Sequence, residues 1–283
     1  MKIILTLILA LAFCAPPLAA QEFTGTLQQI KETGKIRIGY RQFQPPMSFS
    51  GKDGKPAGYS VDLCVQIVNE IQNKVGTEIA IEYIPVQSKN RFSAVSENKI
   101  DILCGSTTKT LSRSEIVDFT QLTFVTGASF MALKGKKIKN NFEGKKIGVV
   151  RDTTTVAALQ ELFQDVSANV DIIPINTTAE AVSALKKGEI DVFSADQVVL
   201  IGLAMAEDSP DTFSILPDLF SYEPFALAVR RNDADFRLIA NRVISHLYRS
   251  KQILTVYDKW FGSFSSTRPE AFDALITINS IPE

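Results

Sequence analysis

Two kinds of hydrophobic pattern alternate along most of the chain. Residues 36–40 alternate apolar and polar positions with a period of two, which is typical of a strand with one buried face. Positions 64, 67, 68, 71 and 75 are apolar and lie on one face of an amphipathic helix over residues 60–75. Further strands are expected at 79–84 and 100–104, with a helix at 88–98 between them. This order predicts an α/β unit with a mainly parallel sheet.

Short local signals indicate where these elements begin. Asp53-Gly54 stands between two short apolar runs, at 47–50 and 57–59, and predicts a hairpin before the first helix. Ser60 and Ser88 are the residues expected to cap the two helices, because a serine hydroxyl can accept a hydrogen bond from a free amide of the first turn.

The same kind of pattern starts again after residue 144. Strands are expected at 147–150, 170–175 and 190–194, and helices at 154–163, 177–188 and 196–207. Extended runs at 123–133 and 225–230 predict two segments that cross between the units as a paired hinge, and helices near 238–247 and 253–260 with a polar tail come last. Ligands in open α/β sheets bind beyond the carboxyl ends of strands, so a cleft between two lobes is expected. The predicted lobes are 21–126 with 226–283, and 127–225.

The first twenty residues have the composition of a signal peptide. Lys2 precedes an apolar run at 3–15, and small residues follow up to Ala20, where cleavage is expected. The mature protein is therefore expected to be exported. A lipoprotein acylated at Cys14 is the alternative, but Phe13 occupies the place where a small residue is needed. No later stretch approaches the ~20 apolar residues of a membrane-spanning helix.

Composition narrows the possible functions. The chain has 30 Lys and Arg against 31 Asp and Glu, and this balance argues against general binding to nucleic acid. One histidine, His246, and three cysteines argue against a Cys/His zinc cluster and against most histidine-based catalysis. We therefore expect a protein that is not an enzyme and needs no metal or other cofactor. We also expect a monomer.

Two cysteines, Cys64 and Cys104, remain after export. An oxidising compartment favours a disulfide between them. Two buried free thiols are the alternative, because the sequence does not give the distance between the two Cα atoms.

Polar side chains that suit a small anion follow the predicted strands. Guanidinium groups bind carboxylates, hydroxyls with helix-start amides suit anions, and an aspartate suits an ammonium group. Taken singly, an arginine can belong to a surface ion pair, and Thr153 or Asp196 can cap a helix. Taken together, they predict a receptor for a zwitterion with excess negative charge. The set is Arg41, Ser88, Arg91, Ser106, Thr108, Arg113, Thr153 and Asp196.

Several segments carry a family resemblance. They are Gly39-Tyr40-Arg41, Pro46-Met47-Ser48-Phe49, residues 53–64, Ser88-Lys89-Asn90-Arg91, residues 104–108 with Arg113, Asp196, and Asp258-Lys259-Trp260-Phe261. In these segments the chain resembles the periplasmic solute-binding proteins of polar amino acid ABC transporters, family 3 type, and within them the glutamate/aspartate-binding branch. The resemblance implies the type II fold of these proteins, with two lobes, two crossing hinge strands and a ligand cleft between the lobes.

The resemblance also implies a role for each site residue. Arg113, Ser106, Thr108 and the helix-start amides at Thr153 match the site for the α-carboxylate, and Asp196 matches the residue that holds the α-ammonium. Arg41, Ser88 and Arg91 match the pocket that binds an acidic side chain. The branch often has a histidine of the second lobe there, where this chain has Asn176-Thr177-Thr178, and we place Thr178 in the pocket. His246, in the C-terminal helices, cannot take that place.

The implied function is capture of glutamate or aspartate by lobe closure and delivery to the permease of an ABC importer in the inner membrane. Two alternatives stay open. The ligand can be another polar amino acid, or the chain can be a periplasmic enzyme on the same fold, similar to cyclohexadienyl dehydratase. An enzyme needs a general acid or base, and Asp196 is the only candidate in the predicted cleft set.

Overall fold

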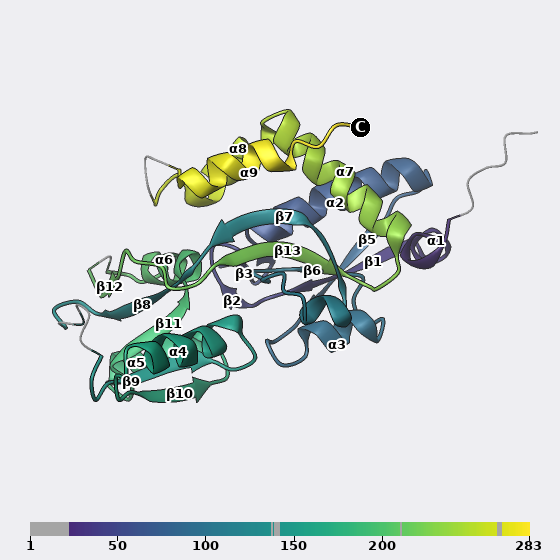
Figure 1. Cartoon of the computed structure of the whole chain (residues 1–283). Coiled ribbons are helices and arrows are strands. Elements are labelled where there is room, and N and C mark those ends of the chain that lie inside the picture. Colours follow the sequence, from purple (N-terminus) through teal and green to yellow (C-terminus); the bar gives the residue numbers. More distant parts are fainter. Residues whose placement is uncertain (1–22, 137, 139–141, 210, 265–267) are drawn as a thin grey trace, which may run out of the picture.

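The computed structural model describes residues 23–136, 138, 142–209, 211–264 and 268–283, and the expected signal peptide with Cys14 lies outside them. Within these residues the chain forms two five-stranded sheets (Figure 1). The first sheet has the order β5 (Ala80–Pro85), β1 (Lys35–Tyr40), β6 (Ile102–Cys104), β13 (Glu223–Val229), β7 (Asp118–Thr126). The second has the order β10 (Asp171–Ile175), β9 (Lys146–Val150), β11 (Val192–Asp196), β8 (Ala128–Leu133), β12 (Phe213–Ile215).

In each sheet three neighbouring strands pair in parallel, and two further strands join through antiparallel pairs. Strands β5, β1 and β6 are parallel, as are β10, β9 and β11, which agrees with the predicted strand–helix–strand units. Strands β13, β7, β8 and β12 add antiparallel pairs. A small third sheet consists of β2 (Phe43–Gln44), β3 (Ser48–Ser50) and β4 (Pro56–Ala57), and it contains the predicted hairpin.

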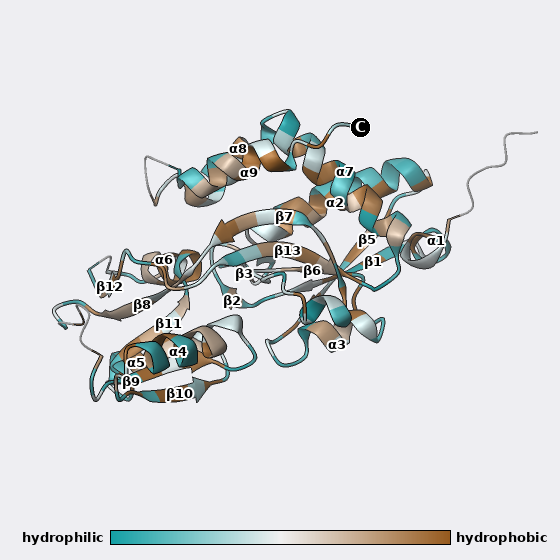
Figure 2. Cartoon of the chain, viewed as in Figure 1, coloured by the Kyte–Doolittle hydropathy of each residue, from teal (hydrophilic) through white to brown (hydrophobic). Residues whose placement is uncertain are grey.

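Helices cover both faces of the first sheet. Figure 1 shows α2 and α7 above it and α3 below it. Figure 2 shows hydrophobic colour along β6 and alternating bands on α7, as expected for a helix with one buried face. The helices are α1 (Gly25–Thr33), α2 (Tyr59–Val75), α3 (Arg91–Ser96), α4 (Thr154–Asp165), α5 (Thr178–Lys187), α6 (Gln197–Met205), α7 (Ala234–Arg249), α8 (Gln252–Phe261) and α9 (Glu270–Asn279). No helix in the described ranges is both long and apolar enough to cross a membrane.

The chain crosses between the two sheets in two adjacent segments, as predicted. Strand β7 passes directly into β8 through Gly127, and the return from β12 enters β13. A Cβ on Gly127 would lie 2.3 Å from the carbonyl oxygen of Ser221, so only glycine permits this close approach. The backbone N–H of Ala128 donates to Oγ of Ser221 at 3.0 Å, which ties the two segments together.

Some local expectations were wrong. Helix α2 begins at Tyr59, and the Ser60 hydroxyl, instead of capping it, donates to the carbonyl oxygen of Gly105 at 3.1 Å. Helix α3 begins at Arg91, and Ser88 is a partner of Arg41 and not a cap. The polar tail contains α9, whose buried Phe272 packs in the core, and α1 was not expected.

A disulfide joins helix α2 to strand β6. Cys64 and Cys104 have their Cα atoms 6.4 Å apart, and both residues are fully buried. The prediction of a disulfide is therefore confirmed. Because the loop that carries Ser106 starts directly after Cys104, the bond anchors the base of a predicted ligand loop.

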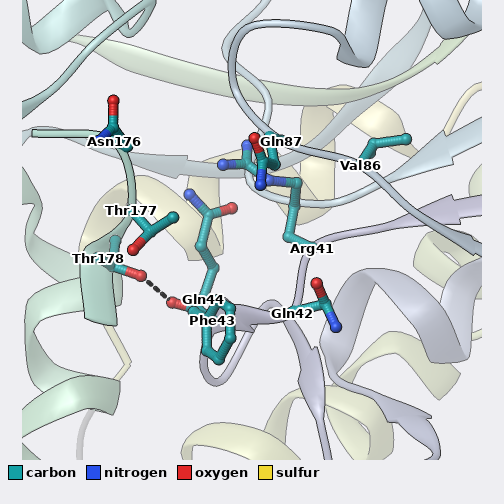
Figure 3. Close-up of a pocket in the computed structure, with 9 residues that line it drawn as sticks. All are labelled: Arg41, Gln42, Phe43, Gln44, Val86, Gln87, Asn176, Thr177 and Thr178. Carbon is teal, nitrogen blue, oxygen red and sulfur yellow. Dashed lines mark hydrogen bonds between the residues drawn. The ribbon is translucent and has the colours of Figure 1, made fainter. Parts of the chain in front are cut away.

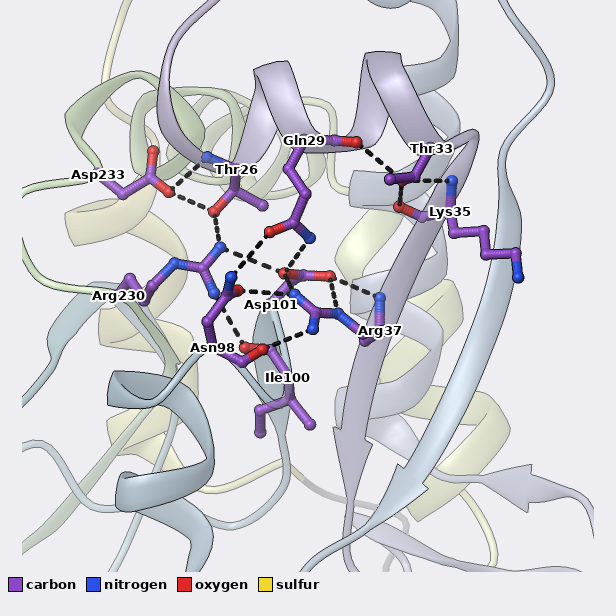
Figure 4. A network of polar contacts seen from close by, with 10 residues as sticks. All are labelled: Thr26, Gln29, Thr33, Lys35, Arg37, Asn98, Ile100, Asp101, Arg230 and Asp233. Carbon is purple, nitrogen blue, oxygen red and sulfur yellow. Dashed lines mark hydrogen bonds and ion pairs between the residues drawn. The ribbon is translucent and has the colours of Figure 1, made fainter.

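A buried network of charges joins the elements at the end of the first sheet opposite to the ligand loops (Figure 4). Asp101, whose side chain is fully buried, accepts hydrogen bonds from Arg37 at 2.7 Å and from Arg230 at 3.2 Å. Gln29 of α1 also donates to Asp101 at 3.1 Å. The hydrogen bond to Asp101 raises the pKa of Arg37, so the guanidinium group stays charged. The network joins α1, β1 and the end of β13 around one carboxylate, far from the ligand loops.

Candidate functional site

The predicted site residues of the first sheet meet at the carboxyl ends of its parallel strands. Arg41, directly after β1, donates through Nη2 to Oγ of Ser88 at 2.8 Å. Ser106, after β6, donates to Oε1 of Gln44 at 2.7 Å. Both serines and Arg41 are buried, and burial lowers the pKa of Arg41 to about 10. The loops after three strands are thus brought together, as the strand-end rule predicts.

Arg91 is the most buried of the three arginines, with 3% of its surface exposed. Its Nη1 donates to the carbonyl oxygen of Ser88, and its Nη2 donates at 2.8 Å to the carbonyl oxygen of Asp152, in the loop before α4. The second bond therefore joins the loops of the two sheets. Burial lowers the pKa of Arg91 well below its usual value, and the charges of Arg41 and Arg113 lower it further.

Arg113 lies in a short 3₁₀ turn, Arg113–Glu115, and donates through Nη1 to the carbonyl oxygen of Thr108 at 2.8 Å. Its guanidinium carbon is 5.2 Å from the centre of the Phe92 ring, and that of Arg91 is 4.5 Å from the same ring. Phe92 therefore offers a cation–π contact to each of the two guanidinium groups. Sequence analysis missed Phe92, although an aromatic residue next to a candidate arginine is a usable signal.

Asp196 lies at the carboxyl end of β11 and faces these arginines from the second sheet. It precedes α6, but its side chain makes no capping hydrogen bond, so the interpretation as a plain helix cap is wrong. Burial and, after it, the charge of Glu223 raise the pKa of Asp196 to about 8, against the lowering effect of the three arginines. With no ligand ammonium in the cleft, the carboxyl group therefore holds a proton at neutral pH.

Thr153 and Thr178 lie at the starts of two helices, each of which follows a strand of the second sheet. Thr153 is the N-cap of α4 and donates through its hydroxyl to the carbonyl oxygen of Val150 at 2.7 Å. Thr178 is the first residue of α5, and its hydroxyl donates across to the carbonyl oxygen of Phe43. The capping residue of α5 is Thr177, which accepts from the amide of Glu180 at 3.1 Å, as its spacing predicted.

A pocket opens between the two sets of loops beside Arg41 (Figure 3). In Figure 3 the segment Asn176 to Thr178 lies opposite Arg41, with Gln44 between them. The segment that replaces the histidine of the glutamate/aspartate-binding branch therefore borders the same pocket as Arg41. Its polar groups are an amide and hydroxyls, which carry no charge.

Glu223, at the first position of β13, is the main residue that sequence analysis missed. It is buried and accepts hydrogen bonds from the hydroxyls of Thr108 at 2.5 Å and Thr154 at 2.7 Å. A hydroxyl has one proton, so the Thr108 hydroxyl cannot donate to Glu223 and to a ligand at once. The signal was a lone acidic residue before an apolar run, but its partners are far away in the sequence.

The loops of the two sheets are in direct contact in this structure. Besides the bonds from Arg91 and Thr178, a Cβ built on Gly202 of α6 would lie 2.1 Å from the carbonyl oxygen of Pro45. A side chain at Gly202 would therefore keep α6 away from the first sheet. The arrangement is a closed one.

Two buried atoms, one of a basic and one of an acidic side chain, remain without a hydrogen-bond partner among the described residues. They are Nε of Arg91, from the first sheet, and Oδ1 of Asp196, from the second. Buried polar groups are nearly always paired, and an unpaired charged group is costly. A ligand that offers a carboxylate to Arg91 and an ammonium to Asp196 would satisfy both.

Comparison with known proteins gives relatives along most of the chain. The chain is 32% identical over 254 residues to the L-glutamate/L-aspartate-binding protein of Pseudomonas aeruginosa, covering 88% of this chain and 84% of the relative. It is 28% identical over 263 residues to the glutamate/aspartate import solute-binding protein of Escherichia coli, covering 90% and 87%.

Solved structures with the same fold extend this comparison. The solute receptor for L-cysteine of Neisseria gonorrhoeae superposes with a TM-score of 0.75 at 25% identity, covering 87% of this chain and 98% of that one. The family model of bacterial extracellular solute-binding proteins, family 3, matches residues 36–263. The fold, the relatives and this match agree, and the chain belongs to the family 3 bacterial extracellular solute-binding proteins.

Proposed function

We propose that this protein is a periplasmic receptor that binds glutamate or aspartate and delivers it to the membrane permease of an ABC importer. The observation that carries the proposal is the pair of unpartnered atoms, Nε of Arg91 and Oδ1 of Asp196. Their opposite charges match the groups of an acidic amino acid. The names of the relatives from Pseudomonas aeruginosa and Escherichia coli support the same ligand class.

The roles within the cleft follow from the positions of the charges. Asp196 receives the α-ammonium group, and Arg113, with the amides at the start of α4, receives the α-carboxylate. Arg91, Arg41 and Ser88 receive the side-chain carboxylate. Ser106, which donates to Gln44, is placed at the α-carboxylate, and Thr178 contributes from the second sheet at the pocket beside Arg41.

Closure is proposed as the movement of two lobes, 21–126 with 226–283 and 127–225, about the crossing segments at Gly127 and Ser221. A ligand that touches both lobes stabilises the closed state over the open one, which is the condition for closure on binding. The bond from Arg91 to the Asp152 carbonyl oxygen and the contact of Gly202 with Pro45 belong to that closed state. Catalysis is not part of the proposal.

Thermal unfolding of the mature protein in the presence of each of the twenty amino acids tests the ligand class. Glutamate or aspartate at about 100 times its dissociation constant should stabilise the protein by about 2.7 kcal/mol, because the ligand binds only the folded state. Stabilisation by a neutral or basic amino acid alone would contradict the acidic assignment.

Alanine substitutions of two arginines test the assigned roles. Arg113→Ala should weaken every amino acid that binds, because it removes a contact to the common α-carboxylate. Arg91→Ala should weaken glutamate about a hundredfold, the equivalent of about 2.7 kcal/mol for a lost charge-assisted contact, and should weaken glutamine much less. Isothermal titration calorimetry of each variant with glutamate and with glutamine gives, for each ligand, the ratio of the dissociation constants of the variant and the wild type. An unchanged glutamate affinity in Arg91→Ala would rule out the pocket assignment.

The raised pKa of Asp196 makes binding release a proton. Below about pH 8 the ligand-free Asp196 is protonated, whereas an ammonium group favours the ionised form. Binding of glutamate at pH 7 should therefore release about one proton, and affinity should rise with pH until about pH 8 and then level off. Titrations at one pH in buffers of different ionisation enthalpy measure the release. Asp196→Asn is the matched control, and it should bind weakly with no release; a wild-type protein that releases no proton would argue against this contact.

A further inference from the structure

Glu223 is held in a fixed position between the two sheets. It is 1% exposed and stands where the chain returns to the first sheet. Its Oε2 accepts from the hydroxyls of Thr108 at 2.5 Å and Thr154 at 2.7 Å, and its Oε1 accepts from Ser221 at 2.8 Å. A carboxylate only accepts hydrogen bonds, so its ionised form satisfies all three donors.

The charge of Glu223 acts on Arg113 and Asp196 without a hydrogen bond to either of them. Its hydrogen bonds in the described part of the chain go to hydroxyl groups, and neither Arg113 nor Asp196 is among its partners. Even so, Glu223 favours the charged form of Arg113 and disfavours that of Asp196. Such effects through space are strong where burial has removed most of the water.

The fixed charges of the cleft can be compared with those of possible ligands. With an amino acid bound and Asp196 ionised, Arg41, Arg91 and Arg113 bring three positive charges and Asp196 and Glu223 bring two negative ones, which leaves one positive charge. An acidic amino acid has two carboxylates and one ammonium and carries one net negative charge. A dicarboxylate without an amino group carries two, so the fixed negative charge of Glu223 disfavours it more than it disfavours an acidic amino acid.

Building on the function proposed above, we propose that Glu223 determines the charge selectivity of the cleft, by disfavouring dicarboxylates that lack an amino group. Asp196 alone does not secure this selectivity. With a pKa raised to about 8 it can keep its proton, and a protonated Asp196 tolerates a ligand that brings no ammonium. Glu223, with three hydroxyl donors, remains a negative charge that such a ligand must meet.

The Glu223→Gln variant tests the proposal, because glutamine keeps the shape and removes the charge. Its carbonyl oxygen can accept from Thr108 and Thr154, and its amide can donate to Ser221. Dissociation constants for L-glutamate and for glutarate, which is the same dicarboxylate without the amino group, are measured at pH 7 by isothermal titration. The preference for glutamate over glutarate should fall by about tenfold or more relative to the wild type. An unchanged preference would overturn the proposal.

Thr154→Val is the matched control, because it removes one hydrogen bond and keeps the charge of Glu223. It should weaken both ligands and leave their ratio as in the wild type. An equal loss of preference in Thr154→Val would overturn the proposal, since the effect would then come from structure and not from charge.

A second variant keeps the proposal testable if Glu223→Gln does not fold. Asp196→Asn should still prefer glutamate over glutarate by about tenfold, because the charge of Glu223 remains. Loss of all preference in that variant would assign the selectivity to Asp196 alone and overturn the proposal. If the wild-type protein binds glutamate but the glutamate-over-glutarate preference does not change in Glu223→Gln, only this inference is refuted. If the wild-type protein binds no acidic amino acid, the proposed function is refuted and this inference with it.

Discussion

Three guanidinium groups share one buried cleft, and the cost of keeping them charged there is the constraint on which the site depends. Burial lowers the pKa of Arg41, Arg91 and Arg113, and the arginines repel one another. The structure offsets part of this cost with Asp196 and Glu223, and with the Phe92 ring, which lies within cation–π distance of two of the guanidinium groups. The remaining positive charge is balanced only when an anion enters, so the same arrangement that strains the empty site favours the bound one.

The fold places these charges at the ends of helices and strands or in the loops that follow them. Parallel strands bring the loops after β1, β5 and β6 to one edge, and the crossing segments at Gly127 and Ser221 bring the end of β11 against them. At the base of one loop the disulfide between Cys64 and Cys104 fixes the strand to α2. At the far end of the same sheet, Asp101 joins α1 to β1 through buried charge pairs (Figure 4). The site therefore rests on a rigid first sheet and a second sheet that contacts it through loops.

Much of this could be predicted from the sequence, because the signals are local. The apolar spacing of residues 64–75 determines α2, and arginines that directly follow strands reach one edge in any parallel sheet. What could not be predicted depends on contacts between distant segments. Ser88 has the features of a helix cap but turns to Arg41, and Glu223 meets Thr108 across 115 positions of sequence. The segment that forms α9 also carries no local signal from which a helix was predicted, and its helix is stabilised by the burial of Phe272.

We propose that the cleft holds an acidic amino acid by its two carboxylates and its amino group at once. A crystal structure of the mature protein grown with L-glutamate is the decisive test. We expect the lobes closed on one glutamate, with its ammonium on Oδ1 of Asp196, its α-carboxylate on Arg113 and its side-chain carboxylate on Nε of Arg91. A glutamate bound with its two carboxylates exchanged, or bound away from Asp196 and Arg91, would contradict it.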